Sequence, residues 1–142
     1  MGSRFSLVLF FSIALWFPCH VLSDATSVLK AFDKSIRLRD YDHAIRQLQP
    51  LLEQGIPEAQ YRMAGLFRSG TGVNRNPEKA IEYYRKAAQN GLADAQYALA
   101  SILEKQSSRQ VNIAEVLRWC QAAADQGHEK AIKKLALLKE AK

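Results

Sequence analysis

The stretch from Pro57 to Gly91 reads PEAQYRMAGLFRSGTGVNRNPEKAIEYYRKAAQNG and holds one complete structural unit of the chain. It recurs 36 residues later as ADAQYALASILEKQSSRQVNIAEVLRWCQAAADQG, at residues 93–127, without insertion or deletion. Several matched positions carry the same residue, such as Ala59 and Ala95, and the three turn glycines Gly55, Gly91 and Gly127 keep the same interval. A period of this length is typical of stacked helical repeats. The sequence therefore predicts an all-α fold, an α-solenoid of antiparallel helix hairpins.

Within each unit, apolar residues recur every three or four positions, which is the period of an α-helix. Two helices fit in one unit, because Asn76 is a favourable N-cap and Pro77 suits a first helical turn. Gly91 then ends the second helix in a left-handed conformation. Extending this pattern to the whole chain gives seven helices. They are expected at about 26–38, 40–54, 57–69, 77–90, 93–105, 111–126 and 129–138.

The helices combine into one solenoid domain over residues 24–142. Its hairpins are expected at about 25–55, 56–91 and 92–127, followed by a closing helix at 128–141. Lys139 occupies the position that Phe67 has in the first full unit, so the last helix presents a polar surface, as capping helices do. The loop of the last unit carries Gln106 and Ser108 in place of two glycines, and we expect its path to differ.

The N-terminus has the three-part pattern of a secretory signal peptide. A short basic segment precedes an uncharged apolar run at 5–17, and small residues lead to an expected cleavage between Ser23 and Asp24. A membrane-spanning helix needs about 20 apolar residues, more than this run supplies. A cleaved signal over 1–23 is therefore expected, with an uncleaved anchor or a lipid on Cys19 as alternatives. The expected location is the periplasm of a Gram-negative bacterium or the medium, with a eukaryotic secretory lumen as the alternative.

The chain is basic, with a formal net charge of +6, and removal of residues 1–23 takes away one arginine and leaves +5. Export argues against nucleic acid as the partner, so the positive balance indicates solubility and a preference for acidic surfaces. The late lysines are interpreted as a solvated end of the molecule. They are Lys130, Lys133, Lys134, Lys139 and Lys142.

Cleavage would also remove Cys19 and leave Cys120 as the single cysteine, which excludes an internal disulfide. Cys120 lies beside Trp119 on an apolar helix face. Free cysteine is among the most buried residue types. We therefore expect Cys120 to be buried and structural rather than redox-active.

The repeat resembles the Sel-one-like repeat (SLR), a relative of the tetratricopeptide repeat. The resemblance covers about 100 residues and rests on the spacing of small, apolar and turn residues. In the first full unit these are Ala59, Met63, Ala64, Phe67, Gly70, Gly72, Val73, Lys79, Ala80, Tyr83, Tyr84, Ala87, Ala88 and Gly91. The family consists mostly of interaction scaffolds, so the resemblance implies a protein or peptide partner. Cysteine-rich members linked to β-lactam binding have a disulfide in each repeat, which this chain lacks.

In related helical repeats, the first helix of each hairpin lines a concave groove. By that analogy the candidate partner-binding residues are Glu58, Tyr61, Arg62, Gly65 and Arg68, then Asp94, Tyr97, Ser101 and Glu104. Aromatic residues and arginine are favoured hot-spot types. The alternative is that Tyr61 and Tyr97 are half-buried and only cover the next helix. Gly65 either allows a close approach or only lowers helix stability.

No pattern for catalysis or metal binding is present. His43 and His128 have no cysteine or second histidine at metal-ligand spacing and are interpreted as surface residues. Phosphate-binding loops and hydrolase signatures are missing from the sequence. We expect no catalytic residue, metal or cofactor.

The expected function is that of a monomeric, exported scaffold or adaptor that binds a partner protein or peptide in its concave groove. One alternative is a regulatory or structural subunit of a bacterial envelope complex, using another face or the basic end. A second alternative is a hydrolase acting on β-lactam or cell-wall substrates.

Overall fold

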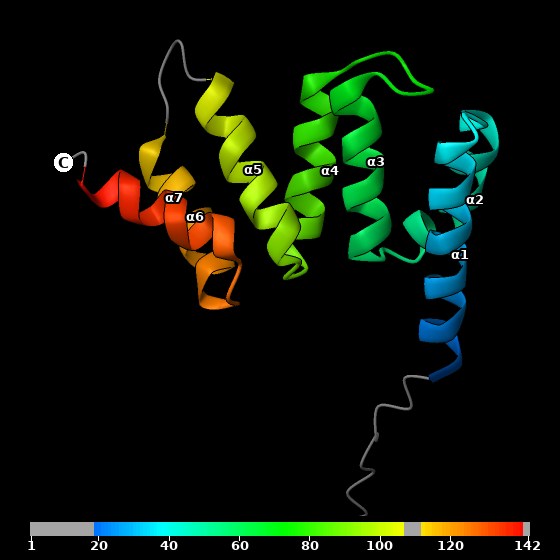
Figure 1. The fold of residues 1–142 in the computed structure, drawn as a ribbon, viewed down its shortest axis with the longest axis horizontal. Coiled ribbons are helices and arrows are strands. Elements are labelled where there is room, and N and C mark those ends of the chain that lie inside the picture. The colour runs from blue at the N-terminus through cyan, green and yellow to red at the C-terminus, as the bar shows by residue number, and fades with distance from the viewer. Residues whose placement is uncertain (1–18, 107–111, 141–142) are drawn as a thin grey trace, which may run out of the picture.

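Seven α-helices form the part of the chain described by the computed structural model, residues 19–106 and 112–140, and no strand occurs there (Figure 1). Their bounds are α1 Cys19–Arg37, α2 Tyr41–Glu53, α3 Pro57–Ser69, α4 Pro77–Gln89, α5 Ala93–Gln106, α6 Ile113–Asp125 and α7 Glu129–Glu140. Each helix packs against the next one in the chain, and the hairpins follow one another across the molecule from α1 and α2 at one end to α6 and α7 at the other (Figure 1). The expected all-α solenoid is confirmed.

Side chains cap three of the helices in the same way. The side-chain oxygens of Asp40, Asn76 and Asn112 accept hydrogen bonds from the backbone N–H of the third residue of α2, α4 and α6, at 3.2, 2.9 and 3.2 Å. An N-cap of this kind satisfies a donor that has no partner within the helix. The cap at Asn76 was expected, and the bounds of α2 to α7 agree with the sequence within two residues at each end.

Helix α1 differs from the expected element. It begins at Cys19 rather than at Thr26 and extends beyond the other helices at its N-terminal end (Figure 1). No proline or glycine lies between these two residues to end a helix. The Ser23–Asp24 bond, the expected cleavage point, therefore lies inside α1. Residues 1–18 are outside the described part of the chain.

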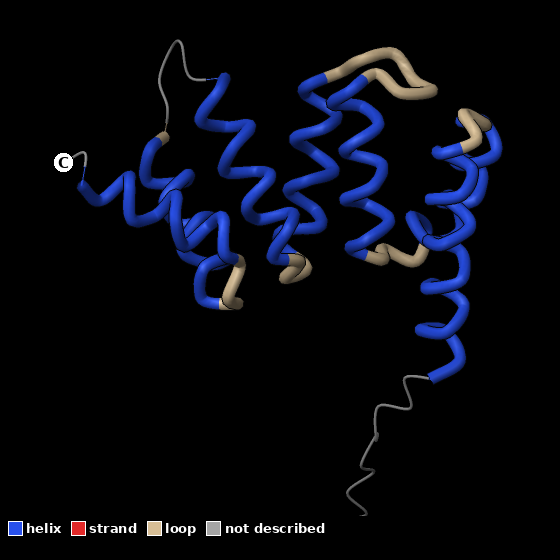
Figure 2. Tube along the Cα trace, in the orientation of Figure 1, coloured by secondary structure: helices blue, strands red, loops and turns tan. Residues whose placement is uncertain are grey.

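Tight turns separate successive hairpins (Figure 2). Gly55, Gly91 and Gly127 follow α2, α4 and α6 with φ of 70, 87 and 81°, a conformation that side chains disfavour. In the longer loop between α3 and α4, Gly72 has φ of 69°, and a Cβ there would lie 2.4 Å from Cβ of Tyr41. The loop of the last unit, residues 107–111, and the side chains of Gln106 and Lys139 are not among the described parts.

The core divides into two clusters along the row of helices. One is formed by α1, α2 and α3 around Phe32 and Leu48, and the other by α3 to α7 around Tyr84 and Leu99. Phe67 and Tyr83 contact both clusters, and their rings stack with centroids 5.7 Å apart. Fully buried alanines let neighbouring helices approach closely. They include Ala59, Ala64, Ala80, Ala87, Ala95 and Ala123.

Two buried glutamines, one in each repeat unit, bond to the turn that ends their own unit. Gln60 accepts a hydrogen bond from Nδ2 of Asn90 at 3.4 Å, and Gln96 accepts one from Nε2 of Gln126 at 2.9 Å. Nε2 of Gln96 also donates to the carbonyl oxygen of Ala88 at 3.2 Å. Both glutamines are buried, so these bonds hold the first helix of each unit against its closing turn, and the bond from Gln96 to Ala88 also joins the second unit to the first.

Candidate functional site: a groove along the first helices

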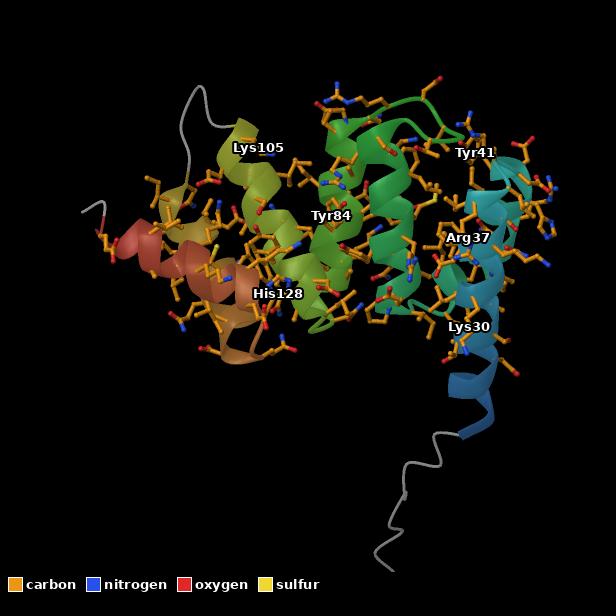
Figure 3. All side chains as sticks on the ribbon, in the orientation of Figure 1. Lys30, Arg37, Tyr41, Tyr84, Lys105 and His128 are labelled. Carbon is orange, nitrogen blue, oxygen red and sulfur yellow. The ribbon has the colours of Figure 1, made fainter. Side chains whose placement is uncertain are left out.

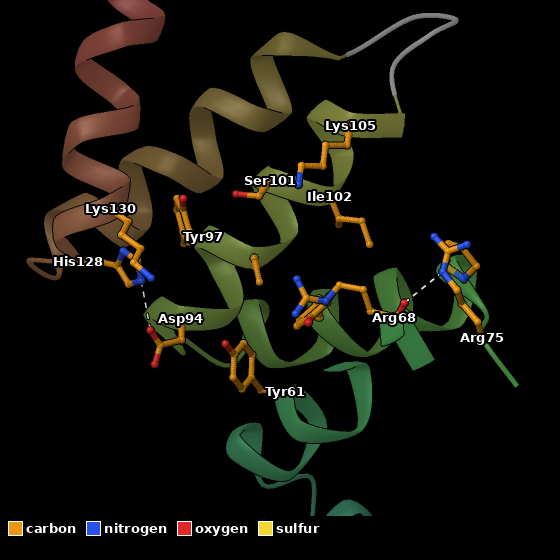
Figure 4. A pocket seen from close by; sticks show the side chains of 13 residues that line it. Tyr61, Arg68, Arg75, Asp94, Tyr97, Ser101, Ile102, Lys105, His128 and Lys130 are labelled. Carbon is orange, nitrogen blue, oxygen red and sulfur yellow. Dashed lines mark hydrogen bonds and ion pairs between the residues drawn. The ribbon is translucent and has the colours of Figure 1, made fainter. Parts of the chain in front are cut away.

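A hollow of about 610 Å³ opens between α3, α4, α5 and the start of α7 (Figure 4). Figure 3 shows Tyr84 near the middle of the row of helices, with Lys105 and His128 at opposite ends of α5. The polar lining consists of cations, one carboxylate, one imidazole and hydroxyl groups. These are Arg68, Arg75, Lys105 and Lys130, then Asp94 and His128, then Tyr61, Tyr84, Tyr97 and Ser101.

Two tyrosines form one wall of this hollow. The rings of Tyr61 from α3 and Tyr84 from α4 have centroids 5.6 Å apart and are tilted by 57°. Tyr84 is only 2 % exposed. Burial raises the pKa of both hydroxyls above the ordinary tyrosine value, and the positive charge of Arg68 partly opposes this shift. Both hydroxyls are therefore protonated at neutral pH and can donate or accept a hydrogen bond.

The opposite wall is built around His128, at the start of α7. Its ring stacks on Tyr97 with centroids 4.7 Å apart, and its side chain is only 14 % exposed. Nδ1 accepts a hydrogen bond from the backbone N–H of Ala131 at 3.1 Å, so the neutral ring carries its proton on Nε2. Nε2 can then donate to Oδ1 of Asp94 at 3.1 Å. The interpretation of His128 as a surface residue was therefore wrong, because it caps α7 and lines the hollow, whereas His43 is exposed.

The remaining polar groups lie on the floor and rim. Oγ of Ser101 is buried and has no hydrogen-bond partner within the described residues. The four cations are exposed, and none of them makes an ion pair with any described residue. Nε of Arg75 donates to the backbone carbonyl oxygen of Arg68 at 3.3 Å, which holds the Arg75 side chain beside α3 (Figure 4).

A second hollow of about 320 Å³ continues the first toward α1. It shares Tyr61, Arg68 and Tyr84 with the first hollow and adds Phe32 of α1 and Gly65 of α3. A Cβ at Gly65 would meet no atom within 4 Å, so this glycine does not serve a close approach of helices. We call the two hollows together the groove. It runs from α1 across α3 and α5 to the start of α7.

The structure brings most, not all, of the candidate residues to the groove. Tyr61, Arg68, Asp94, Tyr97 and Ser101 line the larger hollow, and Arg62 and Gly65 line the smaller one. Glu58 and Glu104 line neither. Glu58 accepts a hydrogen bond from Arg62 at 3.1 Å, and Arg62 also pairs with Asp33. Glu104 pairs with Lys134. The charge of Glu58 is therefore paired within α3, and the charge of Glu104 joins α5 to α7.

Sequence reasoning missed part of the lining. Tyr84 was expected only in the core, and Arg75, Lys105, His128 and Lys130 were not expected in the groove. One signal was available for His128, because the matched positions in the two preceding units are Ile56 and Leu92. A polar residue at a repeat position that is otherwise apolar indicates a local role beyond packing.

Among residues 19–106 and 112–140, no group of three or more His, Cys, Asp or Glu side chains could hold a metal ion. In the same part of the chain, no helix has the length and apolar character needed to cross a membrane.

Cys120 has no exposed surface, and burial raises the pKa of its thiol. This agrees with the expected structural role of the cysteine.

Comparisons with known proteins agree with this architecture. A Sel1 repeat protein from Oxalobacter formigenes, known from a crystal structure, is 33 % identical and has a TM-score of 0.70. The match covers 76 % of this chain and 44 % of that protein. The crystal structure of c5321, a protective antigen present in uropathogenic Escherichia coli strains displaying an SLR fold, has a TM-score of 0.62 at 23 % identity, which concerns the fold alone. This second match covers 67 % of this chain and 20 % of the antigen.

The chain thus spans less than half the length of either protein. A comparison with curated proteins found no match. The model of the Sel1 repeat matches residues 57–92 and again residues 93–128, the two units read from the sequence. With these two repeats filling half of its length, the chain belongs to the Sel1 repeat family.

Proposed function

We propose that this protein is an exported adaptor that binds an extended segment of a partner protein in its groove. Sel1 repeats generally mediate protein–protein interaction. The observation that carries the proposal is the groove itself, in which two hollows join through Tyr61, Arg68 and Tyr84. An enclosed active site would bring reactive groups together, whereas this groove offers aromatic faces with a polar rim. Such a combination suits peptide recognition.

Open space within the groove supports the same proposal. Gly65 lines the smaller hollow, and a Cβ there would meet no atom within 4 Å. A side chain of a bound peptide can fill the space over Gly65. The tyrosine rings then provide rigid apolar contact at low entropic cost.

Site-specific photo-cross-linking in intact cells tests the groove. A photoreactive residue at Gly65 or Lys105 reports on the groove, and one at Glu82 or Arg118 reports on exposed faces of α4 and α6 that line neither hollow. Glu82 and Arg118 are 36 residues apart and serve as matched controls. We expect one partner to be captured from Gly65 and Lys105 only. Capture of that partner only from Glu82 or Arg118 would show that another face binds it.

The proposed location is the periplasm or the extracellular medium, with the chain acting as a monomer. Its support is the basic, apolar and small-residue pattern of residues 1–23. Cys120 is fully buried and so cannot join two folded copies.

Two measurements test this proposal. Mass spectrometry of the full chain, expressed with its own N-terminus, should give a product that begins at Asp24. Light scattering should give the mass of a monomer. A product that retains residues 1–23 would favour a membrane anchor instead.

A further inference from the structure

The charge of the groove points to the chemistry of its occupant. We infer that the partner segment is acidic, with carboxylates on both sides of an aromatic or aliphatic residue. This inference rests on the proposed function and adds to it the class of ligand. It is carried by the four cations around the larger hollow, Arg68, Arg75, Lys105 and Lys130.

These cations differ from those that stabilise the fold. Elsewhere on the helices, Arg62, Arg85, Lys86 and Lys134 each pair with a carboxylate of the chain itself. None of the four groove cations has such a partner among the described residues. Their positive charges converge on one hollow and are available for a ligand.

The one carboxylate in the larger hollow is already engaged. Asp94 accepts a hydrogen bond from Nε2 of His128, whose Nδ1 is held by the backbone of Ala131. The hollow is thus strongly positive, with four cations against one carboxylate. A cleft lined by one sign of charge raises the local concentration of oppositely charged ligands. A basic segment would be repelled there.

The arrangement of the cations also sets the spacing of the ligand. Arg68 and Arg75 lie together on one side, and Lys130 lies beside His128 on the other, with Tyr61 and Tyr97 between them (Figure 4). A guanidinium group binds a carboxylate with two parallel hydrogen bonds, and a lysine acts as a point charge. Carboxylates are therefore expected at both ends of the contact, with an apolar side chain over the tyrosine rings.

Fluorescence anisotropy with three labelled peptides tests the inference. The first peptide has two acidic residues on each side of a phenylalanine. In the second peptide, asparagine or glutamine replaces each acidic residue, and in the third peptide lysine replaces each of them. We expect the acidic peptide to bind, with a Kd that rises with salt because exposed charges are screened. The amide peptide should bind at least about tenfold more weakly, and the lysine peptide should not bind.

Paired charge-neutralising variants locate the binding. Arg75→Gln with Lys105→Gln removes two charges from the groove, and Arg46→Gln with Arg118→Gln removes two exposed charges from α2 and α6. The groove pair should weaken binding of the acidic peptide about tenfold or more. The control pair should leave its Kd within about twofold, because long-range effects of exposed charges are small. Circular dichroism confirms that each variant is folded.

Several results would overturn the inference. Equal binding of the acidic and amide peptides would show that the groove recognises the apolar side chain alone. Equal weakening by both pairs of variants, or equally tight binding of heparin, would show a general attraction of polyanions. If no peptide binds while cross-linking from Gly65 and Lys105 still captures one partner, the acidic class is wrong and the proposed function stands. Failure of both experiments would reject the proposed function as well.

Discussion

At the scale of single residues, Gly65 weakens helix α3 but leaves space in the groove. Its neighbours leave open space around it, and its backbone is helical. Alanine stabilises a helix relative to glycine by about 1 kcal/mol. We therefore expect Gly65→Ala to raise the free energy of unfolding by about 1 kcal/mol, measured by urea denaturation.

Gly72 provides the contrast to Gly65. A methyl group at Gly72 would collide with Tyr41, and its left-handed φ is strained for any side chain. Gly72→Ala should lower the free energy of unfolding by about 1–3 kcal/mol. If Gly65→Ala also lowered the free energy of unfolding, other protein atoms would have to occupy the space beside Gly65 in solution.

Two buried groups that can lose a proton, the Cys120 thiol and the Tyr84 hydroxyl, predict how the stability of the fold depends on pH. Burial raises the pKa of the Cys120 thiol and of the Tyr84 hydroxyl. The folded chain keeps these protons at pH values where the unfolded chain loses them. Their contribution is therefore complete in neutral solution, and the free energy of unfolding falls as the pH rises above about 9.

Urea titrations at about pH 7 and about pH 11 measure this fall, because this range includes the ordinary pKa values of both groups. Cys120→Ala should make the fall smaller, because it removes one of the groups whose pKa differs between the folded and unfolded chains. A variant that loses the same free energy between the two pH values as the wild type would contradict this cause.

At the scale of elements, the helix caps are repeated devices of similar strength. Asn76 and Asn112 occupy matched positions and cap α4 and α6 through the same bond. Replacement of either by alanine should lower the free energy of unfolding by about 1 kcal/mol, and replacement by glycine by only a few tenths. Urea denaturation of the four variants provides the measurement. Alanine variants that unfold at the same urea concentration as the wild type would show that the side-chain bond does not contribute to the stability.

Helix positions were predictable because their signals are local. Asn76 and Pro77 fix the start of α4, and the turn glycines fix the register of each unit. The start of α1 was not predictable in this way. The segment after Cys19 combines features of a signal peptide with those of a helix, and periodicity alone cannot decide between the two.

The groove was only partly predictable because it depends on how the units are arranged in space. Tyr61 and Tyr97 follow from the repeat, since both lie on first helices at matched positions. Arg75 comes from a loop and Lys130 from the first turn of α7, and their approach to α3 and α5 depends on the curvature of the whole solenoid. Glu104 has the right position on its helix, but an ion pair with Lys134 occupies it.

At the scale of the whole molecule, the two core clusters are joined by one aromatic pair. Phe67 and Tyr83 contact both clusters, so they transmit stability from the N-terminal helices to the C-terminal ones. Phe67→Ala should lower stability by about 3 kcal/mol and separate unfolding into two transitions. Hydrogen exchange should then show α1 and α2 opening before α4 to α6.

Phe32→Ala is the matched control, because Phe32 contacts only the N-terminal cluster. It should lower protection in α1 and α2 and leave the protection of α4 to α6 unchanged. A single cooperative transition in Phe67→Ala would show that the glutamine bonds and other contacts couple the units without the aromatic pair.

The fixed interval of the units has a consequence for how such a protein changes over time. Inward positions repeat the same residue, as at Ala59, Ala95 and Ala131, all with no exposed surface. Other matched positions differ from unit to unit, as at Gly65, Ser101 and Leu137. New binding preferences can therefore arise in one helix at a time while the scaffold stays intact. Lys133 stands at the position of Tyr61 and Tyr97, and Lys133→Tyr would carry their aromatic row one unit further.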